Sequence, residues 1–423
     1  MHLRNRSIIA VPLVRALWVG VIALIGLSWS ANVVLAADAP PGPTVSKALA
    51  KPLKAAQDAL QAKNYTDAIA KIKEAQALPG EKTAYDNYAM NIMLFQAYSQ
   101  NHDTANAFQI LALAAQSQYA TPEQRKSWLK NIAFYQFQEK DYTKALETAN
   151  EAVKNGANDS ETENLIAKAQ YLTGKYKDAA TTMQSIVSKM DKPDEDSLKL
   201  LWQFDIKAED KSGAAKAVEK LVTYYPKPEY WANALASLAN ADTKDAHLEL
   251  NIFRLMSDVG VLKRATDYAD MAELALDQGY PGETQAVLQK AFAENVFTDQ
   301  RDKDRYQHLL DGAKQRATTD QASLASNEKK AHDGPTGDGL VQVGAAYLSY
   351  GQNDKAITDL SQGIAKGSLK YPEEANLLLG IAQFRAHDAA GAQKSFEKVA
   401  ASSNEGYARL GKLWALHAGA HSA

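Results

Sequence analysis

The sequence contains no cysteine, and it lacks several other features that define large classes of proteins. Without cysteine there is no disulfide framework, thiol nucleophile, iron–sulfur cluster or cysteine-ligated zinc. Lysine and arginine form no dense block of the kind that sequence-independent nucleic-acid binding requires. After residue 36, no segment is apolar over the ~20 residues that cross a bilayer. These absences favour a protein that does not bind nucleic acid and that packing alone holds together.

The sequence motifs of common enzyme classes are also missing. There is no G-x-S-x-G elbow, phosphate-binding loop, dinucleotide glycine fingerprint or H-E-x-x-H motif. Acidic clusters at 191–196 and 299–304 lie at expected helix starts, where aspartate interacts favourably with the helix dipole. His417 and His421 have the spacing of two helical metal ligands, but a frayed chain end explains them better. The sequence therefore predicts no enzyme activity, cofactor or metal ion.

The N-terminus has the pattern of an export signal. Three arginines precede the uncharged apolar run Ala16–Leu27, and the sequence Val34-Leu35-Ala36 after it has the form of a small-residue cleavage site. This pattern is typical of a secretory signal peptide over residues 1–36, cleaved after Ala36. Its removal would leave 44 basic and 50 acidic residues, a net charge of −6. We expect a periplasmic protein with a short extended linker over 37–46. The alternative is an inner-membrane protein, anchored by an uncleaved N-terminus.

The rest of the chain is rich in alanine, leucine, lysine and glutamine, with the 3–4-residue apolar spacing of helices. A short polar turn followed by a small residue recurs along it. The small residues that follow these turns are Ala68, Ala107, Ala145, Ala179, Ala214, Thr284, Ala356 and Ala392. Their spacing is 34–39 residues except for two intervals of about twice that length, so further units are expected near 249 and 320. Ten helix pairs would fill the chain.

The chain resembles the tetratricopeptide repeat (TPR) family, whose unit is a 34-residue pair of helices. Residues 340–347 (LVQVGAAY) carry the family's glycine and tyrosine on the first helix, and Ala356 stands on the second. The first-helix tryptophan of the family is absent. The resemblance implies an all-α fold, a right-handed TPR superhelix (an α-solenoid) of about ten helix pairs. We expect a helix over 403–423 to cap it.

Two stretches interrupt the repeats. Residues 331–339 (AHDGPTGDG) are glycine-rich and are predicted to form a hinge between a TPR array over 47–330 and a C-terminal TPR pair over 340–402. Residues 298–333 are highly polar and are predicted to form a thin helix pair or a lid of low local stability.

In the TPR family the first helices line a concave groove that binds a protein or peptide. Carrying the family's groove positions over to three units of this chain gives nine residues. They are Lys130, Phe134, Phe137, Asn164, Lys168, Tyr171, Lys199, Gln203 and Lys207. The mixture of lysine, amide and aromatic side chains suits a peptide of some acidic character. Phe134 departs from the family's carboxylate clamp, which requires an asparagine there.

The resemblance implies a scaffold or adaptor for protein–protein interaction, and together with the N-terminal signal pattern it predicts an exported one that acts in the cell envelope. Residues 221–226 with Trp231, and residues 267–292, also resemble periplasmic TPR proteins that accompany TonB–ExbB–ExbD systems, which implies a link to TonB-type energy transduction. The alternative function is that of an accessory protein in outer-membrane assembly or polysaccharide export. An oligomeric state does not follow from the sequence.

Overall fold

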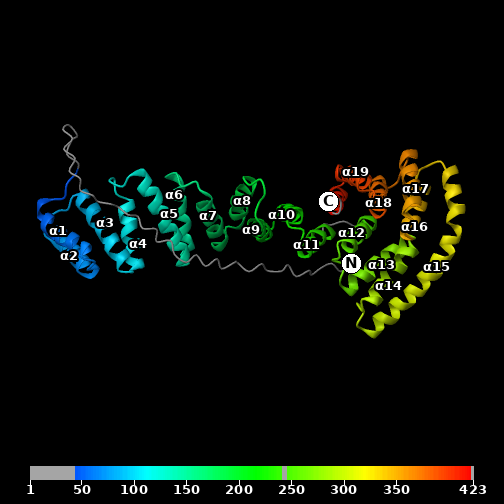
Figure 1. The fold of residues 1–423 in the computed structure, drawn as a ribbon, viewed down its shortest axis with the longest axis horizontal. Helices are drawn as coiled ribbons and strands as arrows, with labels where there is room; N and C mark the ends of the chain where they lie inside the picture. Colours follow the sequence, from blue (N-terminus) through cyan, green and yellow to red (C-terminus); the bar gives the residue numbers. More distant parts are fainter. Residues whose placement is uncertain (1–42, 241–244, 421–423) are drawn as a thin grey trace. The chain divides into compact units, whose positions relative to one another are not determined.

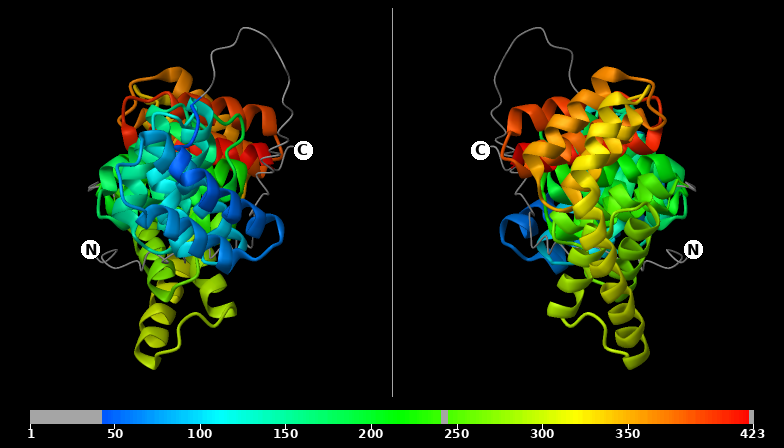
Figure 2. Two further views of the ribbon diagram at one scale, coloured as in Figure 1. Left: turned by 90° about the vertical axis from the view of Figure 1, so that its left-hand side faces the viewer. Right: turned by 90° about the vertical axis from the view of Figure 1, so that its right-hand side faces the viewer.

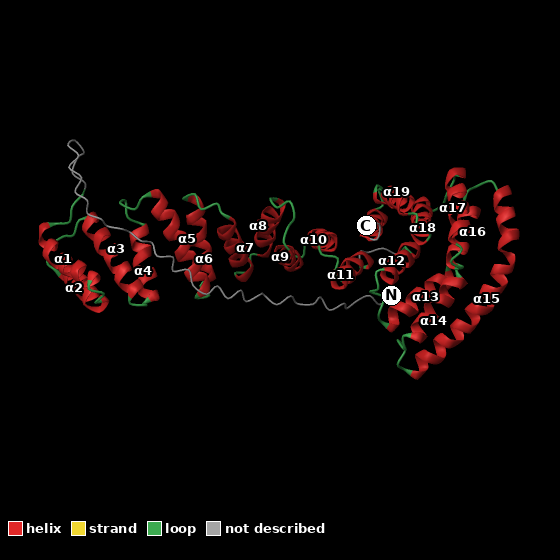
Figure 3. Ribbon diagram, in the orientation of Figure 1, coloured by secondary structure: helices red, strands yellow, loops and turns green. Residues whose placement is uncertain are grey.

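The computed structural model describes residues 43–240 and 245–420. Every regular element in this part of the chain is an α-helix, so the predicted all-α fold of helix pairs is confirmed (Figures 1 and 3). The predicted signal peptide, its cleavage at Ala36 and most of the predicted linker lie outside the described residues. No described helix combines the length and apolar character that a bilayer crossing demands.

The described residues divide into two compact units. Among the described residues, the N-terminal unit comprises 43–193 and 203–210, and the C-terminal unit comprises 194–202, 211–240 and 245–420. The first eight helices, all in the N-terminal unit, are α1 (Lys47–Gln61), α2 (Tyr65–Ala77), α3 (Ala84–Gln100), α4 (Thr104–Ala115), α5 (Pro122–Gln138), α6 (Tyr142–Lys154), α7 (Ser160–Leu172) and α8 (Tyr176–Ser188). Helix α9 (Glu195–Lys207) contributes residues to both units.

The remaining helices belong to the C-terminal unit. They are α10 (Lys211–Tyr224), α11 (Pro228–Ala239), α12 (Ala246–Asp258), α13 (Ala265–Asp277), α14 (Pro281–Ala293), α15 (Gln300–Asp333), α16 (Asp338–Ser349), α17 (Asn353–Lys366), α18 (Pro372–Arg385), α19 (Ala389–Ala400) and α20 (Glu405–Ala420). Helix α20 corresponds to the predicted capping helix.

The turns inside the pairs share one backbone feature. At each of the eight turns that the sequence repeat identifies, one residue has a positive φ between 58° and 83°. These residues are Lys63, His102, Lys140, Gly174, Glu209, Gly279, Gly351 and His387. Five of the eight are not glycine, although glycine adopts this conformation at the least cost. The repeated turn geometry confirms the register of the predicted units.

Small residues behind each turn allow the two helices of a pair to approach closely. Ala68, Ala107, Ala145 and Ala179 are at most 3% exposed. In the pair α16–α17, a Cβ atom added to Gly344 would lie 2.7 Å from Leu360 Cγ and 3.0 Å from the backbone nitrogen of Leu360. These contacts leave no room for a larger side chain.

One predicted pair is wrong. The expected unit near 249 is present as α12, but residues 298–333 do not form two helices; Gln300–Asp333 is one helix of 34 residues (Figure 2). Its buried side chains are Tyr306, Leu310, Ala313, Ala317, Leu324 and Ala331. Their spacing of three, four and seven residues continues across residues 317–324, a stretch without glycine or proline.

The C-terminal unit closes on itself, which an open array of repeats would not do. Helix α20 packs against α11 and α12 as well as against α18 and α19. Between α12 and α18, Asn251 Nδ2 donates to Glu374 Oε1 at 3.1 Å, and Arg385 Nη2 lies 3.4 Å from both carboxylate oxygens of Asp258. These partners are 123 and 127 residues apart in the sequence.

A buried ion pair lies beside this closure. Arg254 donates to both carboxylate oxygens of Glu283 at 2.9 and 2.6 Å, and its Nη1 donates to Asn251 Oδ1 at 2.8 Å. His247 Nδ1 lies 2.7 Å from Glu374 Oε2, and this interaction with the carboxylate raises the pKa of His247. Because each charge in this network has a partner, burial of the charges is compensated.

The predicted hinge has defined contacts. Helix α15 ends at Asp333 and α16 begins at Asp338. The backbone N–H of Gly337 donates to the carbonyl of Gly367 at 2.9 Å, and a Cβ atom on Gly337 would lie 2.0 Å from the carbonyl oxygen of Gly363. Glycine is therefore required here for close approach of two backbones. Motion about this segment stays a prediction.

Candidate partner-binding face

Eight of the nine predicted groove residues lie in the N-terminal unit; Lys199 belongs to the C-terminal unit. On α5, Phe134 and Phe137 are half-buried and pack against the cluster around Ala133, Leu146 and Ile166. The ring of Phe137 also contacts that of Tyr142 edge-on, with centroids 5.1 Å apart. Each phenylalanine thus has one side in the core and keeps part of its surface accessible.

Lys130 is engaged within the protein. Its Nζ lies 3.0 Å from Asp159 Oδ1 and 2.8 Å from Glu161 Oε2, which joins α5 to the start of α7. Burial opposes its charge, but the hydrogen bonds with Glu161 and Asp159 raise the pKa of Lys130. Asp159 also accepts the Thr162 backbone N–H at 3.0 Å and so caps α7. A positioning role for Lys130 follows from these contacts.

Tyr171 on α7 belongs to a small ordered cluster. Its ring stacks on Phe204 at a centroid distance of 4.7 Å, and its hydroxyl accepts a hydrogen bond from Gln203 Nε2 at 2.9 Å. The edge of Tyr176, which is 37% exposed, contacts the same ring at 5.4 Å. The structure therefore brings the predicted residues Tyr171 and Gln203 together.

The remaining predicted residues differ in whether their side chains already have partners within the protein. Asn164 Nδ2 donates to the carbonyl of Ser160 at 2.8 Å, and Lys199 Nζ lies 2.7 Å from Asp196 Oδ1. Lys168 is half-buried and Lys207 is exposed, and neither forms an ion pair within the described part of the chain. Free positive charge for an acidic ligand is therefore available at two of the four predicted lysines.

One buried carboxyl lies next to this face. Asp205, on α9, is 4% exposed, and its Oδ2 has no hydrogen-bond partner. Burial raises the pKa of Asp205 to about 6, and the charge of Asp210 adds to the shift. Burial therefore disfavours the charged form of Asp205, which ionises at a higher pH than an exposed aspartate does.

Aromatic residues on α3 were missed by the sequence analysis. Tyr85 and Tyr88 are half-buried, and both rings contact the ring of Tyr119, with centroid distances of 5.1 and 6.0 Å. Ile92, one helical turn further on, has the same position in its repeat unit as Lys130 has in the next one. Extending the groove positions to the second unit would have identified this helix face.

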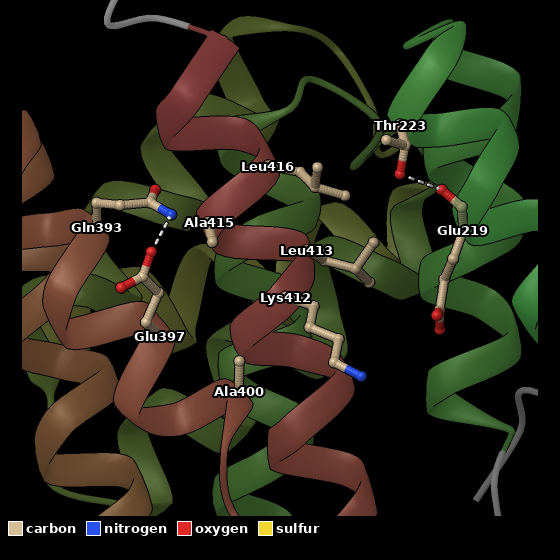
Figure 4. Close-up of a pocket in the computed structure, with 9 residues that line it drawn as sticks. All are labelled: Glu219, Thr223, Gln393, Glu397, Ala400, Lys412, Leu413, Ala415 and Leu416. Carbon is tan, nitrogen blue, oxygen red and sulfur yellow. Dashed lines mark hydrogen bonds between the residues drawn. The ribbon is translucent and has the colours of Figure 1, made fainter. Parts of the chain in front are cut away.

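A hollow of about 380 Å³ lies in the C-terminal unit between α10, α19 and α20 (Figure 4). Its lining residues are Glu219, Thr223, Gln393, Glu397, Ala400, Lys412, Leu413, Ala415 and Leu416. Glu219 is engaged by Arg409 Nε at 2.7 Å, and Gln393 Nε2 donates to Glu397 Oε1 at 2.9 Å. No serine or histidine lines the hollow, so it offers no nucleophile–base pair of the Ser–His type.

Comparisons with known proteins assign no family. No protein-family profile matches the chain, and no curated protein matches it. Among solved structures, the chain is similar to a tetratricopeptide repeat protein from Parabacteroides merdae at 12% identity, which covers 78% of this chain and 98% of that one with a TM-score of 0.28. It is also similar to yeast Tom70, at 12% identity over 88% of this chain and 96% of that one with a TM-score of 0.23. The TPR domain of P58(IPK) shows 11% identity over 89% and 99% of the two chains, with a TM-score of 0.23. The fold assignment therefore rests on the helices themselves.

Proposed function

We propose that the protein is a non-catalytic helical-repeat adaptor that binds a partner protein along the first helices of its N-terminal unit. We name this surface the aromatic face and define it by Phe134, Phe137, Tyr171, Tyr85 and Tyr88. The observation that carries the proposal is that these five rings are only half-buried, whereas the core residues beside them are covered. Aromatic side chains with one side held in place lose little conformational entropy on binding, which suits them as anchors.

The charges around the aromatic face indicate which class of ligand it binds. Lys168 and Lys207 are the predicted groove lysines without an ion pair in the described residues, and Gln203 supplies an amide. An extended or helical peptide with apolar anchors and an occasional acidic residue complements this mixture. Lys130 contributes by positioning α7, because Asp159 and Glu161 already neutralise it.

We further propose that the protein is exported and acts in the cell envelope, with a partner in TonB-type energy transduction. Support for export comes from the arginines and apolar run of residues 1–36, and support for the TonB link from the resemblance of residues 221–226 and 267–292. Fractionation of cells followed by N-terminal sequencing tests export: a mature chain that begins at Ala37 is expected, and retention of Met1 would contradict cleavage.

The double variant Phe134→Ala with Tyr171→Ala tests the binding function. The tagged protein is used to capture partners from envelope extract, which are identified by mass spectrometry. Their affinity for the double variant is expected to fall at least about tenfold, because two anchors are lost. Tyr135→Ala is the matched control, since that ring stacks on Phe108 at 4.3 Å and lies outside the aromatic face.

Two outcomes would contradict the adaptor proposal. Equal partner binding by the wild type and the double variant would remove the aromatic face from the interaction. Retention of the protein by envelope polysaccharide alone would instead favour the accessory role in polysaccharide export. Circular dichroism separates binding from folding, because loss of helix in the double variant would show that the rings are structural.

A further inference from the structure

Three consecutive helices of the C-terminal unit bring a histidine and two carboxylates together. Glu328 and His332 lie one turn apart on α15, and Asp359 lies on α17. One ligand atom from each residue, a carboxylate oxygen or an imidazole nitrogen, lies within 4.8 Å of the other two. Because the whole of α16 separates Asp359 from His332 in the sequence, no local motif reveals the group.

Asp359 is the unusual member of this group. Its residue is 1% exposed, and its Oδ2 is buried without a hydrogen-bond partner. A buried carboxylate oxygen without a partner loses its hydration and gains nothing in return, which is costly. One oxygen of the Asp359 carboxyl lies within 4.8 Å of a ligand atom of Glu328 and of His332, so a cation bound by the three residues would compensate the burial of this carboxyl.

Glu328 is held in place by a neighbouring side chain. The hydroxyl of Tyr347, on α16 between the other two helices, donates to Glu328 Oε2 at 2.7 Å. The second oxygen, Oε1, stays available. Hydrogen bonds of this kind to a ligating carboxylate are a common feature of metal sites, because they orient the ligand before the ion binds.

The two lysines near this group have partners other than its three candidate ligands. Lys355 Nζ lies 4.9 Å from the centroid of the Tyr347 ring, and Lys366 Nζ donates to the carbonyl of His332 at 2.8 Å. The Lys366 contact also ties the C-terminal end of α15 to α17 next to the group. The three candidate ligands therefore remain free to converge on one ion.

We propose that Glu328, His332 and Asp359 form a binding site for a divalent transition-metal ion of the Zn²⁺ type. One imidazole and two carboxylates suit such an ion, whereas Ca²⁺ and Mg²⁺ prefer oxygen ligands alone. Tetrahedral ligands at about 2.1 Å from Zn²⁺ would lie about 3.4 Å apart. The present ligand atoms lie within 4.8 Å of one another. Rotation of the exposed His332 side chain and the half-exposed Glu328 side chain toward the buried Asp359 would shorten these separations to the value that Zn²⁺ requires. Water would complete the coordination, and the ion would link α15 to α17.

The test is a Zn²⁺ titration of the full chain, freed of metal with a chelator and carrying no histidine tag, against a competing chromophoric chelator. One Zn²⁺ per chain is expected. His332→Gln and Asp359→Asn are each expected to weaken binding at least about 100-fold, and Tyr347→Phe about tenfold. His308→Gln is the matched control, because His308 is an exposed histidine on the same helix, and its affinity is expected to equal that of the wild type.

Co²⁺ supplies a second measurement that folding alone does not change. The visible absorption of bound Co²⁺ is expected in the wild type and in His308→Gln, and it should be absent in His332→Gln. Circular dichroism of each variant confirms that the helices persist. The proposal is overturned if the wild type binds no Zn²⁺, if His332→Gln retains the wild-type affinity, or if Ca²⁺ binds as tightly as Zn²⁺.

Discussion

At the scale of single residues, Asp86 shows how one buried carboxylate organises the start of the N-terminal unit. It is 0% exposed and accepts hydrogen bonds from the backbone N–H of Ser46 at 2.8 Å, the Ser46 hydroxyl at 2.6 Å and the backbone N–H of Thr83 at 2.9 Å. Burial opposes its ionisation, but these hydrogen bonds lower the pKa of Asp86 to about 2. The carboxylate both caps α3 and holds the segment before α1.

Asp86→Asn is expected to lower the free energy of unfolding at pH 7 by about 1–2 kcal/mol. The pKa is depressed in the folded state relative to about 4 in the unfolded chain, so the contribution is full above pH 4 and is lost as the pH falls toward 2. Urea unfolding of the wild type and of Asp86→Asn between pH 7 and pH 2.5 measures how the difference in free energy of unfolding depends on pH. Asp58→Asn is the control, because its exposed pair with Lys54 contributes less than about 0.5 kcal/mol. A difference between wild type and Asp86→Asn that stays constant with pH would contradict the assignment.

At the scale of helices, α15 and the pair α16–α17 show what sets helix length and helix contact. The apolar stripe of α15 continues through residues 317–324 without a break, so a turn there would expose Ala317 and Leu324. In α16–α17, the contact depends on the missing side chain of Gly344. Each feature can be tested by one substitution with a matched control.

Thr319→Pro tests whether α15 is continuous. Proline at this exposed mid-helix position removes one backbone hydrogen bond and clashes with the preceding turn, so a loss of about 3 kcal/mol in the free energy of unfolding is expected. Thr319→Ala should be neutral or stabilise by a few tenths of a kcal/mol, since alanine is the better helix former. Denaturant titration followed by circular dichroism measures both. If proline is tolerated as well as alanine, the middle of α15 is a turn.

Gly344→Ala is expected to destabilise the protein by about 1–3 kcal/mol, because the new methyl group would overlap Leu360. Gly312→Ala provides the contrast. A Cβ atom there meets nothing within 4 Å on an exposed face of α15, and glycine costs about 0.5–1 kcal/mol relative to alanine inside a helix. Thermal unfolding should therefore shift in opposite directions for the two substitutions. A rise in Tm for Gly344→Ala would contradict the close contact.

At the scale of the whole molecule, the C-terminal unit is distinguished by its closure. Trp414 on α20 is 0% exposed, and its ring stacks on Phe396 at 5.3 Å. The same helix packs against α12 and α11, from which seven and eight helices, respectively, separate it in chain order. A perturbation at Trp414 is therefore expected to reach helices that are remote in sequence.

Trp414→Ala should cost about 3–5 kcal/mol and should accelerate hydrogen exchange at the amides of α12 as well as those of α19. In an open array each helix pair contacts only its neighbours, and exchange would then rise only near α18–α20. Hydrogen exchange followed by mass spectrometry distinguishes the two cases. Trp414→Phe, which keeps a stacked ring, is the control and should leave the exchange of α12 nearly unchanged.

The sequence predicted the helices and their turns well because both are local properties. The positive φ at Lys140 and His387 follows from the same short motif that opens each second helix. The prediction failed at α15 because the repeat period was extended through residues 317–324, which contain no glycine or proline to end a helix. The apolar spacing from Tyr306 to Ala331 was the better guide there.

The candidate face stays a prediction, and its contacts were not predicted. Tyr171 and Gln203 are hydrogen-bonded in the structure, and the ion pairs of Lys130 with Asp159 and Glu161 depend on how α7 begins beside α5. Repeat position specifies which side of a helix a residue occupies. Its partners are set by neighbouring helices, whose charges a repeat pattern does not encode.

What the sequence by itself determined is therefore the class of fold, the register of the helix pairs and the absence of cysteine chemistry, because these depend on composition and on contacts within a repeat or between adjacent repeats. Only the tertiary structure decided that α12 and α18 lie side by side and that Asp359 meets Glu328 and His332. These contacts form only when helices that are not neighbours in the sequence pack together, and local apolar periodicity carries no information about which of them will do so.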